Sequence, residues 1–432
     1  MTTDCRQTES QSSPLAIAGG APDDWRRGLI RTDVSPAVAR SMIVLFLGML
    51  FGVPLAQVAF ELRGGQRPGV LDLCSNGRFP TRSDLKQYED ALQEQSRAVR
   101  FFQPRAQELL IAWGGCGTTQ VVLGRDGWLF YRPGIDSVTG PGFLEPQTLR
   151  RRVRNLRDVA VTETVTPDPR PAILDFQQQV RAAGARLILL PIPDKASLQA
   201  AQLGGRRATA APPQNSSFAR LVQELRAAGV DVFDPSPPIV RPGEIRYLAQ
   251  DTHWTPQWMA EVACALAAEI RPRLETSARQ DLHFASETVT GVGDLTEMLR
   301  LTEQQTLFAP QTVTIQRVLD AAGRPVRADA QAQVLLLGDS FTNIYSARQM
   351  VWGEGAGLAE HLAYHLGQPI DWIARNDAGA YATREMLSSQ MAQGRNRLAG
   401  KRVVVWQFAA RELAVGDWRS VVRQHGAIDE LP

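Results

Sequence analysis

The sequence QVLLLGDSF, residues 333–341, contains the apolar run 334–337, which passes directly into a glycine, an acid and a serine. A run of this kind is typical of a strand buried on both faces of a parallel sheet. Gly338 allows the chain to turn sharply where the strand ends. A serine at such a turn can raise its hydroxyl to the rim of the sheet, so Ser340 is a candidate nucleophile. The alternative is that Asp339 and Ser340 only cap a helix.

The segments around this stretch continue the pattern, with apolar runs separated by stretches of helical spacing. Strands are predicted at 185–191, 230–233, 333–337, 370–373 and 401–406. Helices are predicted at 171–183, 216–228, 357–366 and 382–393, with a further helix beginning at Gln257. Apolar strands that alternate with helices predict an α/β domain with a mostly parallel sheet covered on both faces. Residues 276–330 are irregular, and we interpret them as a small β insertion.

Polar residues stand at the ends of several predicted strands, where parallel sheets carry their chemistry. These ends are Pro193-Asp194-Lys195, Gly338-Asp339-Ser340, Asn376-Asp377-Ala378-Gly379 and Gln407-Phe408. Because the carboxyl ends of parallel strands share one edge of the sheet, we expect these groups to converge on one site.

A second motif, Asp251-Thr252-His253-Trp254, precedes the helix predicted from Gln257. Thr255-Pro256 is typical of an N-cap followed by the first residue of a helix, so the motif lies in the loop before it. Side chains two apart in an extended loop point the same way. The Asp251 carboxylate can therefore orient the His253 imidazole through Nδ1 and leave Nε2 free as a base. The alternative is a surface histidine with a capping aspartate.

Two other histidines have the spacing of a metal pair. His361 and His365 lie four apart on the predicted helix 357–366. No glutamate or cysteine pattern of metal-site type accompanies them. We therefore interpret them as packing or surface residues, and we predict neither a metal site nor a cofactor.

The N-terminal part of the chain predicts a membrane anchor. Residues 1–40 are interpreted as a disordered cytoplasmic tail, and the apolar run 41–60 is long enough to cross a bilayer as a helix. Four arginines precede the run, which places its N-terminal side in the cytoplasm: Arg26, Arg27, Arg31 and Arg40. A cleaved signal peptide is the alternative, although no A-x-A pattern follows the run. The prediction is a single-pass inner-membrane protein with its catalytic domain in the periplasm.

The exported part divides into a linker with a juxtamembrane helix at 61–120 and the α/β domain at 121–420. Within these, a helix is predicted at 81–113 and a hairpin at 121–131. The net charge of +2 and the lack of like-charge blocks give no indication of nucleic-acid binding.

The cysteines are consistent with export. Cys74 and Cys116 lie in the exported part and are predicted to form a disulfide, as an oxidising compartment permits. The alternative is two unrelated free thiols. Cys264 lies in a helical segment and is predicted to be a buried apolar residue.

The motif order, DTHW first and GDSF later, resembles the alginate O-acetyltransferase family of AlgJ and AlgX type. In that family an SGNH hydrolase-like domain is permuted, so the order is inverted relative to ordinary SGNH hydrolases. The resemblance covers about residues 80–415, and the N-terminal anchor is similar to that of the J-type members. Three more segments match in the same order: GRDGWLFYRPG (124–134), LPIPDKASL (190–198) and VVVWQFAARELA (403–414).

The resemblance implies a three-layer, flavodoxin-like SGNH domain with Ser340 as nucleophile, His253 as general base and acid, and Asp251 as the residue that orients it. The usual third-block asparagine is absent, and a glutamine stands near the place where the family often has glutamate. The candidate oxyanion-stabilising or substrate-binding residues are Gly379, Asn376, Gln407, Tyr345 and Arg411.

The reaction that the resemblance implies is the transfer of an acetyl group to an exopolysaccharide. A membrane-bound O-acyltransferase partner would supply the acetyl group, because the periplasm offers little free acetyl-CoA. Two alternatives stay open. The same triad would serve an esterase that deacetylates a polysaccharide, and a non-catalytic polysaccharide-binding protein could share the fold.

Overall fold

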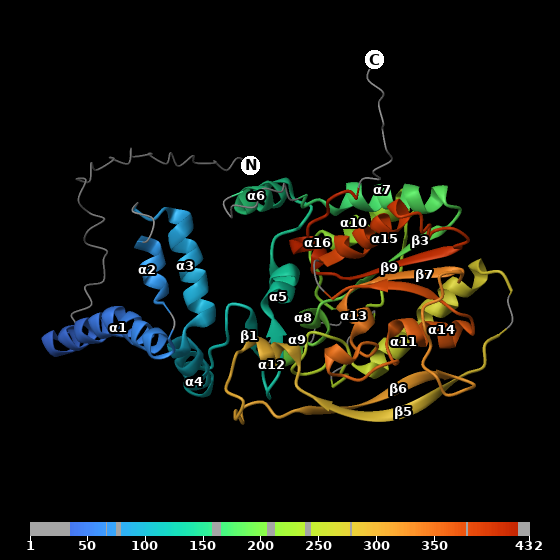
Figure 1. Ribbon diagram of the computed structural model, residues 1–432. Coiled ribbons are helices and arrows are strands. Elements are labelled where there is room, and N and C mark those ends of the chain that lie inside the picture. Colours follow the sequence, from blue (N-terminus) through green and yellow to red (C-terminus); the bar gives the residue numbers. More distant parts are fainter. Residues whose placement is uncertain are drawn as a thin grey trace, which may run out of the picture. The chain divides into compact units, whose positions relative to one another are not determined.

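The computed structural model describes residues 35–65, 67–74, 79–157, 166–204, 212–237, 243–276, 279–376 and 379–421 (Figure 1). The chain divides into two compact units, residues 1–101 and 102–432, each of which is described by itself. The predicted disordered tail lies outside the described residues except for its last part, which is helical.

The first unit begins with one long apolar helix, α1 (Pro36–Arg63). Ser35 caps it by accepting the N–H of Val38 at 3.4 Å, and the helix extends the predicted span 41–60 at both ends. Among the described residues, α1 is the one helix that is long and apolar enough to cross a membrane. Two shorter helices follow in the same unit: α2 (Gly69–Cys74), within the predicted linker, and α3 (Arg82–Gln95).

The helix predicted at 81–113 is in fact two helices, α3 and α4 (Arg97–Gly114). The Ser96 hydroxyl accepts the N–H of Val99 at 3.3 Å. The break therefore has a local cause, because a serine side chain at an N-cap competes with continuation of the preceding helix.

The second unit is built on a five-stranded parallel sheet with the spatial order β4-β3-β9-β7-β8. If the strands are renumbered 1 to 5 in the sequence β7, β8, β9, β3, β4, their spatial order from β8 to β4 is 2-1-3-4-5. This is the strand order of flavodoxin-like folds. The sheet thus has the permuted connectivity that the motif order implied. The strands are β3 (Arg186–Ile192), β4 (Asp231–Val232), β7 (Val334–Gly338), β8 (Asp371–Ala374) and β9 (Val403–Ala409).

Helices cover both faces of this sheet, which makes the three layers that were predicted (Figure 1). Along β7, Leu336 packs into the core on one face, whereas Leu335 and Leu337 pack into the core on the other. Burial of each such leucine contributes roughly 1.5–3 kcal/mol. One face carries α7 (Pro169–Ala182), α10 (Phe218–Ala227) and α15 (Ala382–Ala392), and the other carries α11 (Pro256–Ile270) and α14 (Leu358–Leu366).

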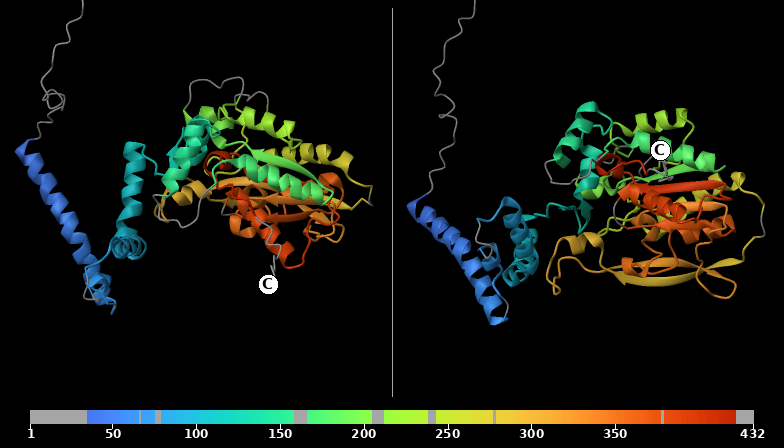
Figure 2. Two further views of the ribbon diagram at one scale, coloured as in Figure 1. Left: turned by 90° about the horizontal axis from the view of Figure 1, so that it is seen from above. Right: turned by 45° about the horizontal axis from the view of Figure 1, so that its top comes forward.

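A long two-stranded ribbon lies outside the helices α11 and α14, as Figure 1 and the right view of Figure 2 show. It consists of β5 (Leu282–Gly291) and β6 (Gln311–Asp320), which pair antiparallel along their whole length. Ile315 anchors the ribbon in the core beneath it. The β insertion predicted within 276–330 is therefore confirmed, and it is more regular than the sequence indicated.

The predicted hairpin is also present, as β1 (Val121–Leu123) and β2 (Leu129–Tyr131). Its turn uses positive φ angles at Asp126 and Gly127. The hairpin shares a small core with α12 (Asp294–Met298), which places a segment from the end of β5 close to β2. Among the described residues, the remaining elements are α5 (Arg132–Thr139), α6 (Pro146–Arg157), α8 (Lys195–Leu198), α9 (Ala200–Leu203), α13 (Ser340–Asn343), α16 (Glu412–Val415) and three short 3₁₀ turns.

The prediction that Cys264 is buried is wrong, whereas the predicted disulfide stays a prediction. Cys116 is exposed, and its Sγ lies 3.4 Å from the Gly114 carbonyl oxygen. The disulfide between Cys116 and Cys74 stays a prediction, because the side chain of Cys74 lies outside the described residues. Cys264 is exposed as well, because α11 buries the face that carries Val262, Ala263 and Leu266, and position 264 falls on the opposite face.

Candidate active site

The loop that carries the DTHW motif is held closed by backbone pairing at its base. Tyr247 and Trp254 form an antiparallel bridge, and the Leu248 N–H donates to the His253 carbonyl at 3.1 Å. Thr255 caps α11 as predicted, accepting the N–H of Trp258 at 3.3 Å. Asp251 and His253 therefore stand on a tight loop whose two ends are fixed.

The turn after β7 is shaped by Asp339 and Gln407. Asp339 Oδ1 accepts the N–H of Phe341 at 2.9 Å, and its Oδ2 accepts the N–H of Ala409 in β9 at 2.8 Å. Gln407 accepts the Asp339 N–H at 3.0 Å and donates Nε2–H to Asp339 Oδ1 at 2.7 Å. Asp339 is thus the capping residue, and Ser340, the first residue of α13, keeps its hydroxyl free for another partner.

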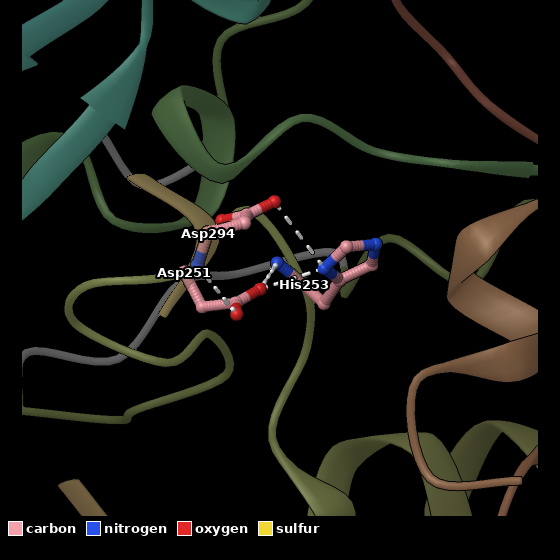
Figure 3. A group of neighbouring side chains, drawn as sticks. All are labelled: Asp251, His253 and Asp294. Atoms are coloured by element: carbon pink, nitrogen blue, oxygen red, sulfur yellow. Dashed lines mark hydrogen bonds and ion pairs between the residues drawn. The ribbon is translucent and has the colours of Figure 1, made fainter. Parts of the chain in front are cut away.

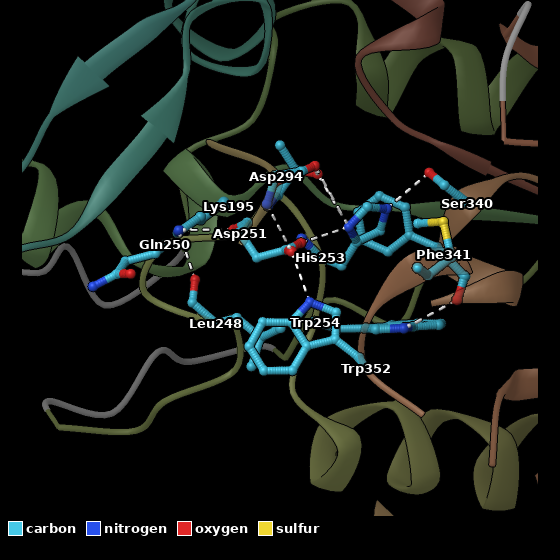
Figure 4. A network of polar contacts seen from close by, with 12 residues as sticks. Lys195, Leu248, Gln250, Asp251, His253, Trp254, Asp294, Ser340, Phe341 and Trp352 are labelled. Carbon is cyan, nitrogen blue, oxygen red and sulfur yellow. Dashed lines mark hydrogen bonds and ion pairs between the residues drawn. The ribbon is translucent and has the colours of Figure 1, made fainter. Parts of the chain in front are cut away.

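That partner is His253, as Figure 4 shows. Ser340 Oγ lies 2.8 Å from His253 Nε2, and His253 Nδ1 lies 2.6 Å from Asp251 Oδ1. Asp251 and His253 are each only 2% exposed, whereas Ser340 is partly exposed. The three side chains predicted to form a triad therefore make one continuous hydrogen-bonded chain that ends at an accessible hydroxyl.

Asp251 is held in its ionised form by four N–H groups. Its Oδ1 accepts the backbone and Nδ1 protons of His253, at 3.0 and 2.6 Å, and its Oδ2 accepts Trp352 Nε1–H at 2.9 Å and the Asp294 N–H at 3.1 Å. Burial opposes ionisation, but the charge of His253 and these donors outweigh it and lower the pKa of Asp251. In return, Asp251 raises the pKa of His253 although burial works in the opposite direction.

A buried lysine supports the same loop from below. Lys195 Nζ lies 2.6 Å from the Leu129 carbonyl oxygen, 2.7 Å from that of Leu248, and 2.9 Å from those of Ala249 and Asp251. Burial lowers the pKa of Lys195 to about 7, against the opposing charges of nearby carboxylates. One ammonium group therefore ties the β1–β2 hairpin to the loop that carries the triad acid and base.

The comparisons with known proteins agree with this arrangement. Residues 121–410 match the model of the SGNH hydrolase-like domain of acetyltransferase AlgX. The chain belongs to the AlgX family. It carries, therefore, an SGNH-type acetyltransferase domain, and the resemblance drawn from the two motifs is confirmed.

Curated relatives also match about two thirds or more of the chain. Probable alginate O-acetylase AlgJ of Pseudomonas aeruginosa is 26% identical over 345 residues, which is 73% of this chain and 78% of that protein. The AlgJ of Pseudomonas putida is 28% identical over 313 residues, 69% of this chain and 71% of that protein. The solved O-acetyltransferase domain of Pseudomonas putida AlgJ superimposes with a TM-score of 0.50 at 24% identity, covering 69% of this chain and 93% of that domain. The fold is therefore shared.

Two residues suggested as ligands of an oxyanion or substrate have other roles in this AlgX-family domain. Gln407 lies inside β9, is 1% exposed, and has both polar atoms of its amide engaged by the Ser340 turn. Tyr345 is fully buried, and its hydroxyl donates to the Trp254 carbonyl at 2.6 Å. Both side chains are buried and hold the two triad segments in place.

The other candidates lie around the nucleophile turn. Asn376 accepts a hydrogen bond from Asn343, the last residue of α13, at 2.8 Å. Gly379 has φ of 60°, and a Cβ there would lie 2.3 Å from a carboxylate oxygen of Glu412, so only glycine fits. The Arg411 guanidinium lies 5.9 Å from the centre of the Phe341 ring, next to Ser340.

The three residues Asp251, His253 and Asp294 form a compact group of possible metal ligands (Figure 3), with ligand atoms within 4.8 Å of one another. Their atoms are already engaged, because Nδ1 of His253 bonds to Asp251 and both Asp294 oxygens accept protons from Thr252. The triad therefore accounts for the group. His361 packs beside the Phe284 ring at 5.1 Å between centroids, as the packing interpretation expected.

Two residues of the site, Trp352 and Asp294, were not identified from the sequence. Lys195 was identified, but its role was not. Lys195 alone had a signal, because it stands at a predicted strand end within the family segment 190–198. Trp352 lies in an irregular segment and Asp294 begins the short helix α12, both without a sequence motif, and only the folded chain brings them to Asp251.

Proposed function

We propose that this chain is a membrane-anchored, exported O-acetyltransferase that transfers acetyl groups to an exopolysaccharide through an acyl-enzyme on Ser340. The observation that supports it most is the hydrogen-bonded chain from Asp251 through His253 to the accessible Ser340 hydroxyl. Membership of the AlgX family makes acetyl transfer the expected use of that chain.

The reaction proceeds in two displacements. Ser340 Oγ attacks the acetyl carbonyl while its proton moves to His253 Nε2, and that proton then leaves with the departing donor group. In the second step a sugar hydroxyl attacks the acyl-enzyme, its proton moves to Nε2, and Oγ recovers a proton as the ester bond to Ser340 breaks. Asp251 orients the imidazole and stabilises the imidazolium in both steps.

The oxyanion of each tetrahedral intermediate needs donors close to Ser340 Oγ. We assign this role to the Ser340 N–H, at the start of α13, together with Gly379 and Asn376 at the neighbouring strand end. The contact between Asn376 and Asn343 supports the assignment, because it places that strand end against the nucleophile turn. Arg411, beside Phe341, is assigned to acceptor binding.

The location and partners follow from α1 and from the relatives. The arginines before the apolar helix favour an N-terminus in the cytoplasm and a domain in the periplasm. An exported enzyme has little acetyl-CoA, so the donor is assigned to a membrane-bound O-acyltransferase. The acceptor is a polysaccharide, since the relatives are named as alginate O-acetylases.

The test uses the full-length chain in detergent with a small aryl acetate as donor and polysaccharide oligomers, including oligouronates, as acceptor. Acetylated oligomers, detected by mass spectrometry, are expected with the wild type and are expected to disappear in Ser340→Ala. Ser389→Ala, which changes an exposed serine on α15, is the matched control and should behave as wild type. Release of acetate without acetylated oligomer would favour the esterase instead. No turnover of any ester would favour a binding protein.

A further inference from the structure

A second carboxylate, Asp294, lies beside the Asp251–His253 pair on the side away from Ser340 (Figure 4). Its Oδ2 is 3.8 Å from His253 Nδ1. Its Oδ1 accepts the Thr252 N–H at 2.8 Å, and its Oδ2 accepts the Thr252 hydroxyl at 2.5 Å. Asp294 therefore binds both the backbone and the side chain of Thr252, which stands between the triad acid and the triad base.

The Thr252 hydroxyl connects Asp294 to the imidazole. Thr252 Oγ1 lies 3.1 Å from His253 Nδ1, the nitrogen whose proton is donated to Asp251. Because the hydroxyl gives its own proton to Asp294, its lone pairs face that Nδ1–H. The ring is thus held by two acceptors, Asp251 directly and Asp294 through Thr252, and rotation away from Ser340 would break both contacts.

The segment before α12 is shaped to bring Asp294 this close. A Cβ on Gly293 would lie 2.1 Å from the Gln250 carbonyl oxygen, so a larger residue would force the two segments apart. The Asp294 N–H also donates to Asp251 Oδ2 at 3.1 Å. The contact is therefore a built part of the site rather than a chance approach of a surface acid.

The charges around His253 balance when the imidazole is protonated. Asp251 and Asp294 supply two negative charges, while Lys195 and the imidazolium supply two positive ones. Arg411 also faces His253, and its charge is opposed by nearby carboxylates, Asp194 first and Glu412 next. With a neutral imidazole the group of four is left with an excess negative charge, so its field favours the protonated state.

We propose that Asp294 is a positioning residue for acyl transfer, which acts through Thr252 and through its own charge to hold His253 toward Ser340 and to favour the imidazolium. The proposal rests on the proposed function, in which the Oγ–C bond forms as the Oγ proton moves to Nε2. The positive charge then appears within 3.8 Å of Asp294 and 2.6 Å of Asp251.

The decisive variant is Asp294→Asn, which keeps an oxygen acceptor for Thr252 but removes the charge. For a small aryl acetate, we expect kcat to fall on the order of tenfold with KM unchanged. This is a modest part of the roughly 10²- to 10⁴-fold rate enhancement that general acid–base catalysis provides. The acid limb of kcat/KM should move to lower pH, because the charge of Asp294 raises the pKa of His253. A purely structural defect would not move that limb.

Two matched variants separate charge from position. Glu297→Gln makes the same chemical change on the exposed face of α12 and should leave both kcat and the pH profile as in the wild type. Thr252→Val removes the hydroxyl but keeps both carboxylates, so kcat should fall while the acid limb stays in place. Thr252→Ser, which restores the hydroxyl, should recover most of the rate.

Three results would overturn the inference. The first is a wild-type kcat and pH profile in Asp294→Asn, and the second is an equal shift of the acid limb of kcat/KM in Asp294→Asn and Glu297→Gln. The third is a wild-type kcat in Thr252→Val. Should Asp294→Asn fail to fold, an NMR titration of the His253 ring in the Ser340→Ala chain replaces it. A second inflection from Asp294 is expected, because burial first and Asp251 next raise the pKa of Asp294, and its absence would contradict the proposal. Turnover by Ser340→Ala would instead refute the proposed function itself.

Discussion

Ser340 Oγ lies 2.8 Å from His253 Nε2, although the two residues are 87 positions apart in the chain. Two hydrogen bonds between the residues that follow His253 and Ser340 in the chain fix this distance. Trp254 Nε1–H donates to the Phe341 carbonyl at 3.1 Å, and the Tyr345 hydroxyl donates to the Trp254 carbonyl at 2.6 Å. The residue after the base is thus bound to the segment that carries the nucleophile, so the two halves of the triad move together.

Substitution of any triad member should abolish ester turnover without unfolding the protein. We expect Ser340→Ala and His253→Ala to lower kcat/KM on the order of 10⁴-fold or more, without additivity, because the residues act as one unit. Asp251→Asn should be nearly as severe, because an amide favours the wrong tautomer of His253. The measurement is hydrolysis of an aryl acetate alongside the thermal melting temperature. Asp281→Asn, an exposed acid two residues before another histidine, should retain activity; an equal loss there would show that the effect is not specific to the triad.

The pH profile should report the raised pKa of His253. Burial disfavours the imidazolium, but the charge of Asp251 more than compensates and raises this pKa above the ordinary value of about 6.5. The base must be neutral, so kcat/KM should rise with pH through a value above about 6.5. In Asp251→Asn the residual activity should have its acid limb at lower pH, because the compensating charge is gone. An acid limb below that of free imidazole in the wild type would contradict this account.

The two buried lysines should differ in their effects. Lys195→Met leaves four carbonyl oxygens beneath the catalytic loop without their donor, and we expect a loss of about 3 kcal/mol or more in unfolding free energy together with a large loss of kcat. Lys401 stands just before β9, at the end of the sheet opposite the triad, and its Nζ donates to the Ala330 and Ala332 carbonyls. Lys401→Met should therefore lower stability by denaturant titration while the folded fraction keeps its kcat. Equal kcat losses would argue against a specific role for Lys195.

The chain should cross the inner membrane once, with its C-terminus in the periplasm. The apolar helix α1 and the arginines before it are the reason. A periplasm-specific reporter fused after Pro432 should be active, and the intact mass of the purified chain should include the segment 36–63. A cytoplasm-specific reporter active at the same place would exclude export. A mass that lacks the segment would identify a cleaved signal peptide.

Much of the fold could be predicted from local sequence because its signals are local. The run 334–337 is apolar at every position, as a strand buried on both faces requires, and it lies within β7. The order of DTHW before GDSF indicated the permuted connectivity that the strand order then confirmed. The break at Ser96 shows the limit of such signals, because an apolar period of 3.6 continues through a cap that only the hydroxyl hydrogen bond reveals.

For the site, spacing alone was insufficient. Asp281-Leu282-His283 has the same acid-x-histidine pattern as Asp251-Thr252-His253, yet it lies exposed at the start of β5. Only the proximity of Ser340 distinguishes the two pairs. Gln407 lies in the family segment 403–414 and Tyr345 shortly after the GDSF motif, but both side chains are buried in the core, since side-chain direction depends on the register of a strand or helix rather than on sequence distance.

The sequence by itself determined the nature of the chemistry: a serine at the end of an apolar strand, an acid two residues before a histidine, and an apolar segment suited to a membrane. The tertiary structure decided the environment in which that chemistry works. Asp294, Trp352 and Lys195 come from segments far from one another, and they meet at Asp251 because the ribbon, the hairpin and the sheet pack into one unit. Burial and electrostatic coupling act through space, so the charge state of His253 is a property of the folded chain and not of any motif within it.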